Sequence, residues 1–214
     1  MKIHLYYYPF TCAMVPYIAL TEAGAEFEVL VLNLQKQEHR SPEFIKINPK
    51  HKVPVLIVDG ERLTENVAIH LWVSRVFPDA GILPSEPWKQ AQAVSMLTWF
   101  SSGIHPFLSR INIPVKVCDV HGTSDSVVRL ALETLNECFA IADKLLAGRE
   151  YFFDSFTAPD AHFFWCTRRS MQLKVDLSPY SNVISHFERI KVRPSVQKLL
   201  AFEKKTIEGF KMVA

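Results

Sequence analysis

Cys12 is the residue of this sequence best placed for nucleophilic chemistry. An apolar and aromatic run, Ile3–Tyr8, comes before it and predicts a buried β-strand, and a helical pattern follows from Met14 to Gly24. Cys12 is therefore expected at a strand-to-helix turn, beside a helix N-terminus whose free N–H groups and dipole favour an anion. A thiol in such a place tends to have a lowered pKa and thiolate character. Taken by itself, Cys12 is equally compatible with a buried, inert cysteine.

A second candidate for ligand binding surrounds Pro54, near the start of a predicted strand, Val53–Val58. A proline at that point removes no hydrogen bond from the sheet. If the Val53–Pro54 bond were cis, the N–H and C=O of Val53 could turn outward and pair with an extended ligand. An ordinary trans proline is more frequent, and the spacing alone favours it.

A third candidate is the tripeptide Thr64-Glu65-Asn66, which opens a predicted helix. Thr64 can cap this helix, while Glu65 and the first-turn N–H groups could hold the ammonium and carboxylate of a ligand together. A plain capped helix with a dipole-favoured glutamate is the more common meaning of such a tripeptide.

The segment that carries these candidates alternates strand and helix. Residues 1–76 predict the order β-α-β-α-β-β-α, including a second strand at Phe27–Leu32, a helix start at Ser41-Pro42 and a tight turn at Asp59-Gly60. That order indicates a small α/β domain with a mixed sheet.

The remainder of the chain has a different pattern. Residues 77–87 contain three prolines and a glycine, which is typical of a linker. Residues 88–214 show helical periodicity without strand-like alternation, so an all-α domain is expected there.

The composition limits the classes of partner. The chain has 214 residues, of which 49% are hydrophobic and 21% charged, and its formal net charge is only +2. This balance predicts no nucleic-acid partner. No apolar run approaches the roughly 20 residues of a membrane helix, so no membrane association is predicted. The lack of a signal peptide and of paired cysteines favours a cytoplasmic location.

No metal site is predicted. His162 and Cys166 stand four residues apart on one predicted helix and could reach the same ion, but no third ligand is evident nearby.

Several motifs together resemble the cytosolic glutathione transferase family. They are the thiol turn at Cys12, then Val53–Leu56, then Leu63–Ile69, then the helix-start box Phe156–Ala161 in the all-α half. In that last box, Asp160 would return a hydrogen bond to the backbone of the capping residue Thr157. Tyr7–Pro16 looks most like the bacterial beta class, which keeps a cysteine at this place.

The resemblance implies a thioredoxin-like, glutathione-binding domain over residues 1–76 and a helical-bundle substrate domain over 88–214. Val53, followed by Pro54, would pair with the cysteinyl backbone of glutathione, and Glu65 with Asn66 would take its γ-glutamyl end. Asn66 departs from the serine usual in the family, yet its amide can still bond a carboxylate. Lys52 is the predicted partner of the glycine carboxylate, with Lys36 and His39 as alternatives.

The same resemblance assigns a histidine of the first C-terminal helix to the site, and His105 is its match. Pro106 follows where the beta class has a basic residue, which predicts a bend in the helix and the loss of one ligand contact. The predicted catalytic residues are Cys12, Thr11 as a hydroxyl donor, and His105. A catalytic role for Tyr7 or Tyr8 is the lesser alternative.

The implied reaction is attack of the glutathione thiolate on a small hydrophobic electrophile, as in detoxification, by an enzyme that is typically a homodimer. The electrophile is expected in an apolar interdomain cleft. Its predicted contacts are Phe10, Met14, His105 and Phe107. Two alternatives stay open: a glutathione-dependent thiol–disulfide oxidoreductase that uses Cys12 covalently, and a non-catalytic ligand-binding member of the same fold.

Overall fold

The computed structural model describes residues 1–212 and contains two compact units. One unit comprises Met1–Ser85 together with the chain from Val192 onward, and the other comprises Glu86–Lys191. The first change of unit, between residues 85 and 86, falls inside the predicted linker. The end of the chain differs from the sequence prediction, because the last helix groups with the N-terminal unit rather than with the helical one.

The N-terminal unit is built on a four-stranded sheet in the order β2-β1-β3-β4. The strands are β1 (Ile3–Tyr7), β2 (Glu28–Val31), β3 (Val55–Val58) and β4 (Glu61–Thr64). β1 pairs parallel with β2 and antiparallel with β3, and β3 pairs antiparallel with β4, so the sheet is mixed. The predicted turn at Asp59-Gly60 joins β3 to β4, and both residues adopt the positive φ that such a turn requires.

Over the described part of the chain, four helices complete this unit, of which the first three were predicted for it from the sequence and the last was not. They are α1 (Met14–Glu22), α2 (Pro42–Ile47), α3 (Asn66–Val76) and α9 (Pro194–Met212), with short 3₁₀ turns η1 (Glu38–Arg40) and η2 (Pro78–Ala80). The hydroxyl oxygen of Ser41 accepts a hydrogen bond from the Phe44 N–H at 3.1 Å and so caps α2. α1 is buried from Met14 to Leu20 and contacts both α3 and α9.

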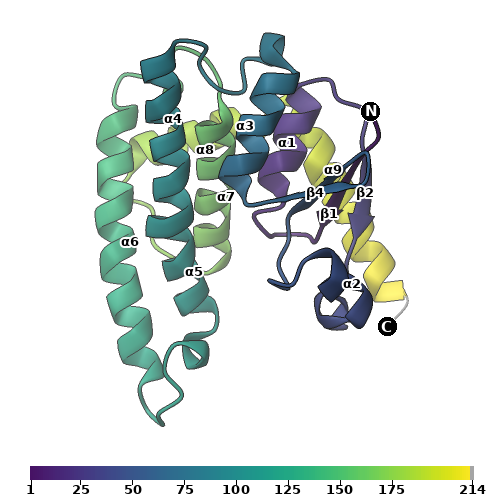
Figure 1. Cartoon of the computed structure of the whole chain (residues 1–214). Coiled ribbons are helices and arrows are strands. Elements are labelled where there is room, and N and C mark those ends of the chain that lie inside the picture. The colour runs from purple at the N-terminus through teal and green to yellow at the C-terminus, as the bar shows by residue number, and fades with distance from the viewer. Residues whose placement is uncertain (213–214) are drawn as a thin grey trace. The chain divides into compact units, whose positions relative to one another are not determined.

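α9 lies beside α1 (Figure 1), and charged and aromatic side chains attach the two helices to each other. Arg193 donates two hydrogen bonds to the Glu22 carboxylate, each 2.9 Å long, and the Ser195 hydroxyl donates a third. Farther along α9, the Phe202 ring stacks on the Tyr17 ring with centroids 5.6 Å apart. These contacts explain why a helix from the end of the chain belongs to the N-terminal unit.

The second unit is entirely helical over its described residues. Its elements are α4 (Pro87–Trp99), the π-helical turn η3 (Phe100–Ile104), α5 (His105–Asn112), the 3₁₀ turn η4 (Pro114–Lys116), α6 (Ser124–Leu146), α7 (Ala158–Gln172) and α8 (Ser181–Lys191). α7 is buried on nearly every side and contacts α4, α5 and α8. The predicted α/β-then-all-α fold class is confirmed, apart from the placement of α9.

The start of α7 is fixed by the buried carboxylate of Asp160. This side chain is fully buried and accepts hydrogen bonds from the Thr157 N–H (2.8 Å), the Thr157 hydroxyl (2.9 Å) and the Phe152 N–H (3.0 Å). Nε2 of His186 lies 2.9 Å from Oδ1, the same oxygen that accepts the bond from Phe152. The predicted return bond from Asp160 to the Thr157 backbone is therefore confirmed.

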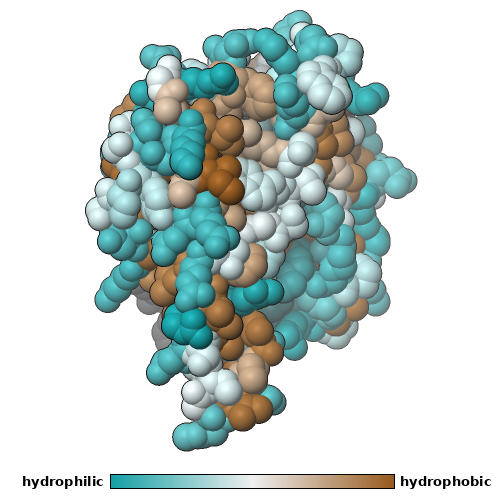
Figure 2. Space-filling view, turned by 90° about the vertical axis from the view of Figure 1, so that its left-hand side faces the viewer, coloured by the Kyte–Doolittle hydropathy of each residue, from teal (hydrophilic) through white to brown (hydrophobic). Residues whose placement is uncertain are grey.

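The surface of the helical unit is mixed in polarity. Exposed apolar side chains on α6, among them Leu130, Ile141 and Leu145, stand between charged ones. The space-filling view shows brown apolar groups in several separate places on this face rather than in one continuous area (Figure 2). Within residues 1–212, no helix combines the length and apolarity that crossing a membrane demands.

Candidate active site

The turn between β1 and α1 presents Cys12. The Thr11 hydroxyl accepts a hydrogen bond from the Ala13 N–H at 3.3 Å and donates one to the Tyr8 carbonyl at 2.7 Å. The N–H groups of Met14 and Val15 bond to the carbonyls of Thr11 and Cys12, each at 3.2 Å. The predicted strand–turn–helix is thus present, and Thr11 holds its shape. The hydroxyl hydrogen of Thr11 is already used in this turn, so donation to a thiolate would require it to change partners.

Three separate segments meet at Cys12. Its Sγ lies 3.8 Å from the Val53 carbonyl oxygen, and the Asn66 amide donates a hydrogen bond to its backbone carbonyl at 3.3 Å. Cys12, Val53 and Asn66 are therefore brought together, as the three sequence motifs suggested separately.

The thiol of Cys12 is neutral at physiological pH in this structure. Burial raises its pKa to about 12, and this effect outweighs the hydrogen bond from Asn66 and the positive charge of Lys52, which both lower it. The negative charge of Glu65 adds to the rise. The predicted lowering of the Cys12 pKa is wrong for the unliganded protein, because loss of hydration at the sulfur exceeds the stabilisation that the helix N-terminus was expected to provide.

The segment before β3 presents the backbone of Val53. The Val53–Pro54 peptide bond is cis. Among residues 1–212, no hydrogen bond uses the N–H of Val53, and its carbonyl accepts only the long contact from the Cys12 thiol. The loop is fixed by the buried Asn48, whose amide donates to the Lys52 carbonyl at 2.8 Å. Val53 therefore offers one donor and one acceptor to an extended ligand.

Glu65 stands at the N-cap of α3 with φ 73°, a conformation uncommon for a side chain of this kind. Its carboxylate is 69% exposed and is paired with the ammonium of Lys50, with Nζ and Oε1 2.5 Å apart. The same ammonium donates to the Thr64 hydroxyl at 2.7 Å. The predicted Thr64 cap is wrong, since Glu65 is the cap residue and its side chain makes no capping bond. The first-turn N–H groups of α3 thus remain suited to an anion.

Lys52 has an exposed side chain beside this region. Its charge acts on Cys12, as the lowering effect on the thiol pKa indicates. Its predicted pairing with a glycine carboxylate stays a prediction.

Comparison with known proteins gives the family of this chain. The family model described as the N-terminal domain of glutathione S-transferase matches residues 1–75. A zeta-class glutathione S-transferase from Euphorbia esula is 31% identical over 174 residues, a match that covers 75% of this chain and 75% of that relative. The chain belongs to the glutathione S-transferase family.

Solved structures of glutathione S-transferases extend the similarity over nearly the whole chain. One is a sphingomonad glutathione S-transferase complexed with glutathione, and another is the bacterial beta class enzyme of Sphingomonas chungbukensis. Each is 30% identical with a TM-score of 0.82, and each match covers 94% of this chain and 98% of the other. The sequence-based assignment to a transferase family with beta-class resemblance is confirmed.

In this glutathione S-transferase, two predicted substrate contacts belong to the N-terminal unit. Phe10 is 37% exposed, which suits contact with a ligand, and its φ of 65° lies in the left-handed region. Met14 is completely buried and has no surface to offer a substrate. The prediction for Met14 failed because the first turn of α1 is buried on all sides, a pattern that helical periodicity does not reveal.

The other predicted contacts belong to the helical unit. The ring of His105 packs edge-on against the ring of Trp165, with centroids 4.4 Å apart. The guanidinium carbon of Arg110 lies 4.3 Å from the centre of the Phe107 ring. A π-helical turn, η3, ends immediately before His105, and the bend predicted at Pro106 stays a prediction.

Sequence reasoning missed Glu203, which this family member brings from α9 to the Cys12 turn. Its side chain is buried, and its carboxylate accepts hydrogen bonds from the Tyr7 hydroxyl and from the Phe10 N–H. A signal was available, since Glu203 continues the buried stripe of Val196 and Leu199 at helical spacing. An acidic residue in such a stripe needs a partner inside the protein. The side chain of Tyr7 is fully buried and its hydroxyl donates to Glu203. Tyr7 is therefore a core residue in this structure.

Proposed function

We propose that this protein binds glutathione and catalyses attack of the glutathione sulfur on a small hydrophobic electrophile. The observation that carries the proposal is that Cys12 lies within hydrogen-bonding distance of both Val53 and Asn66, next to Glu65 at the start of α3. This part of the N-terminal unit offers three kinds of group to a ligand. They are the backbone N–H and C=O of Val53, the N–H groups at the start of α3, and the exposed carboxylate of Glu65. A γ-glutamyl tripeptide has the complementary groups in the matching order.

Each polar group of glutathione has a proposed partner. Its cysteinyl backbone pairs with the N–H and C=O of Val53, beside Pro54. Its ammonium binds the Glu65 carboxylate in place of Lys50, and its γ-glutamyl carboxylate binds the Asn66 amide and the first-turn N–H groups of α3. Its glycine carboxylate binds Lys52.

The attacking sulfur is proposed to be that of glutathione and not that of Cys12. A thiol whose pKa burial raises to about 12 is protonated at neutral pH, so it can act as an S–H donor toward a neighbouring thiolate. The thiolate to be stabilised is then the ligand's own. This assignment favours conjugation over the covalent thiol–disulfide route, for which Cys12 would have to ionise.

Among the predicted substrate contacts, Phe10 is retained as an exposed apolar side chain in the Cys12 turn. His105 and Phe107 are retained as residues of the helical unit, with His105 proposed to polarise the substrate or to hydrogen-bond the sulfur. The cytoplasmic location expected from the composition is also part of the proposal.

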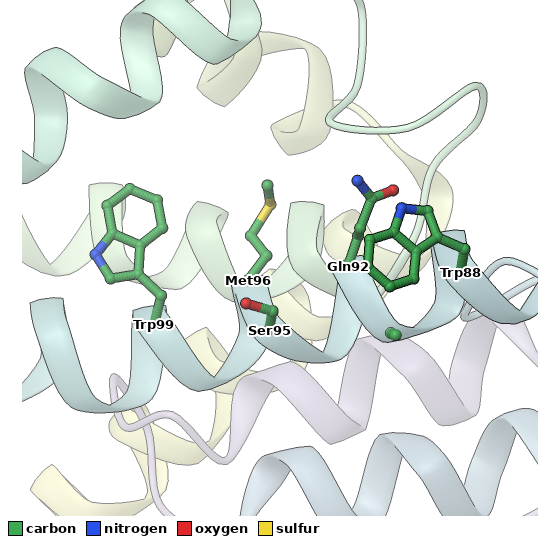
Figure 3. Close-up of a pocket in the computed structure, with 6 residues that line it drawn as sticks. Trp88, Gln92, Ser95, Met96 and Trp99 are labelled. Carbon is green, nitrogen blue, oxygen red and sulfur yellow. The ribbon is translucent and has the colours of Figure 1, made fainter.

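A homodimer is proposed, and the outer face of α4 is the surface that supports it. Figure 3 shows Trp88, Gln92, Met96 and Trp99 projecting from one side of this helix. They border a hollow of about 440 Å³, and Trp88 is 71% exposed. An exposed tryptophan beside an apolar hollow is typical of an interface. Sedimentation velocity should show a dimer that Trp88→Glu weakens, and a monomeric wild-type protein would contradict this assignment.

The proposed reaction is tested by turnover with aryl halides, epoxides and α,β-unsaturated carbonyls in the presence of glutathione. Wild-type protein should form the thioether with at least one class, and Cys12→Ala should keep part of the rate, because the nucleophile belongs to the ligand. Mass spectrometry of the Cys12 peptide after incubation with oxidised glutathione separates the alternatives. If a stable Cys12–glutathione disulfide forms and Cys12→Ala loses all disulfide reduction, the protein is a covalent thiol–disulfide oxidoreductase and this proposal is wrong. Glutathione binding without turnover on any substrate would favour the non-catalytic alternative.

A further inference from the structure

Glu203 is a buried acidic residue of α9. Its hydrogen-bond donors Tyr7 and Phe10 belong, as it does, to the N-terminal unit. Its side chain is only 1% exposed, although it carries a carboxylate. One carboxylate oxygen, Oε1, accepts a short hydrogen bond from the Tyr7 hydroxyl and a second from the Phe10 N–H at 2.8 Å. Burying such a group is unfavourable unless it is hydrogen-bonded, and these bonds help to stabilise the carboxylate in the interior.

The two donors flank the beginning of the Cys12 turn. Tyr7 is the last residue of β1, and Phe10 lies in the turn two positions before Cys12. Phe10 has φ 65°, a conformation that bulky residues seldom adopt without support from their surroundings. The bond from its N–H to Glu203 supplies such support. One acceptor thus fixes both the end of the strand and the unusual backbone that follows it.

The helix that carries Glu203 is itself held at several points. Arg193 and Ser195 attach its beginning to Glu22, as described above. On the two sides of Glu203 in the sequence, the ring of Phe202 packs against Tyr7 and the ring of Phe210 stacks on Tyr8. α9 therefore offers a rigid support from which the carboxylate can position the turn.

We infer that Glu203 is a positioning residue for the active-site turn: its carboxylate fixes the Tyr7 hydroxyl and the Phe10 N–H, and thereby sets the place at which Cys12 meets the glutathione sulfur. This inference rests on the proposed function and adds the end of the chain to its site. The pKa of Cys12 is raised mainly by burial, and its neighbours Asn66, Glu65 and Lys52 modify that shift. In this inference, Glu203 acts through the backbone of the turn, which its bonds to Tyr7 and Phe10 hold in place.

The test compares Glu203→Met, which removes the acceptor, with Glu203→Gln, which keeps an oxygen that can accept both bonds. Misplacement of the turn by about 1 Å can cost about a hundredfold in rate. We expect kcat for conjugation to fall about ten- to a hundredfold in Glu203→Met and to recover to within about threefold in Glu203→Gln. The dissociation constant of glutathione should change by less than about threefold in both, because Val53, Glu65 and Asn66 are untouched.

Tyr7→Phe and Tyr17→Phe form a matched pair if Glu203→Met fails to fold. Tyr7→Phe removes the hydroxyl that donates to Glu203 and should give an intermediate loss of kcat. Tyr17 is also buried and packs on the same Phe202 ring, but no hydrogen bond within residues 1–212 uses its hydroxyl. Tyr17→Phe should therefore leave kcat unchanged.

A second measurement is independent of glutathione chemistry. The rate at which iodoacetamide alkylates Cys12 in the unliganded protein should rise in Glu203→Met and in Tyr7→Phe, but not in Tyr17→Phe or Glu203→Gln. The inference would be overturned if Glu203→Met had a lowered melting temperature but kept the wild-type kcat and the wild-type alkylation rate. If Glu203→Met does not fold, the same result in Tyr7→Phe would overturn it. If wild-type protein neither binds nor uses glutathione, the proposed function fails, while the alkylation series still decides whether Glu203 positions the turn.

Discussion

The sulfur of Cys12 lies 3.8 Å from the carbonyl oxygen of Val53, although 41 positions separate the two residues in the chain. This contact joins a thiol to the backbone group that is best disposed to pair with a peptide. A glutathione cysteinyl group bonded to Val53 would place its own sulfur near that of Cys12. The site therefore has two thiols to distinguish, and their protonation states decide which one reacts.

The first prediction concerns the reactivity of Cys12 in the unliganded protein. Because burial raises its pKa to about 12, iodoacetamide should modify Cys12 slowly at neutral pH and faster as the pH rises. Cys118 is the internal control, since the hydrogen bond from the Thr123 side chain, with one from the Val120 backbone, lowers its pKa. Peptide mass spectrometry at neutral pH should find Cys118 alkylated before Cys12. The opposite order would mean that Cys12 is a thiolate.

The second prediction concerns Lys50, whose ammonium occupies the Glu65 carboxylate where the ammonium of glutathione is proposed to bind. Exposed ion pairs of this kind contribute about 0–1 kcal/mol, so Lys50→Met should tighten glutathione binding by at most about fivefold. Lys46→Met removes a nearby exposed charge that takes no part in this pair and should have no effect. Weaker binding in Lys50→Met would show that Lys50 contacts the ligand instead.

The third prediction concerns His70, a buried residue of α3 whose ring contacts the backbone of Asn66. Its Nδ1 lies 2.5 Å from the Asn66 carbonyl oxygen, and burial lowers its pKa to about 4, although its hydrogen bonds to the backbone of Asn66 and Val15 act to raise it. Between about pH 6.5 and 4 the unfolded chain binds one more proton at this residue than the folded chain does. Its contribution to stability therefore falls as the pH falls through that window, by up to about 1.4 kcal/mol per pH unit.

His70→Asn checks this pH dependence by comparison with the wild-type protein. Urea unfolding at a series of pH values should show a shallower loss of stability between pH 6.5 and 4 in the variant, whatever its stability at pH 7. Identical slopes would mean that His70 titrates normally in the folded state.

The fourth prediction concerns Asp160 in the helical unit. Replacing it by alanine leaves buried donors of Phe152, Thr157 and His186 without their acceptor, which should cost about 3 kcal/mol or more in the free energy of unfolding. Asp154→Ala is the matched control, because that carboxylate is exposed, and it should change the melting temperature little. Glutathione binding by folded Asp160→Ala should be unaltered. Lost catalysis with an unchanged melting temperature would instead assign Asp160 to the site.

Local patterns predicted the parts of the structure that depend on neighbours in the sequence. The strand before Cys12, the cap at Ser41-Pro42, the turn at Asp59-Gly60 and the bond from Asp160 to Thr157 all follow from residue types a few positions apart. The resemblance of motifs then predicted that Cys12, Val53 and Asn66 would form one site.

The failures involve burial and contacts across the whole chain. The Cys12 pKa depends on how much water reaches the sulfur, which no local pattern encodes. Met14 lies on a helix buried all round, and α9 returns to α1 through Glu22 and Arg193, which are 171 positions apart. The contact of Glu203 with Phe10 spans 193 positions. A buried acid on a helix indicates that a partner exists, but only the fold identifies it.

The central claim, that glutathione binds along Val53, Glu65 and Asn66, is tested most directly by calorimetric titration of glutathione into wild-type protein and Glu65→Gln. The variant keeps the size of the side chain and removes the charge that would pair with the γ-glutamyl ammonium. We predict measurable binding by the wild-type protein and a loss of at least about tenfold in Glu65→Gln, equivalent to about 1.4 kcal/mol. Equal affinities, or no binding by the wild-type protein, would contradict the account.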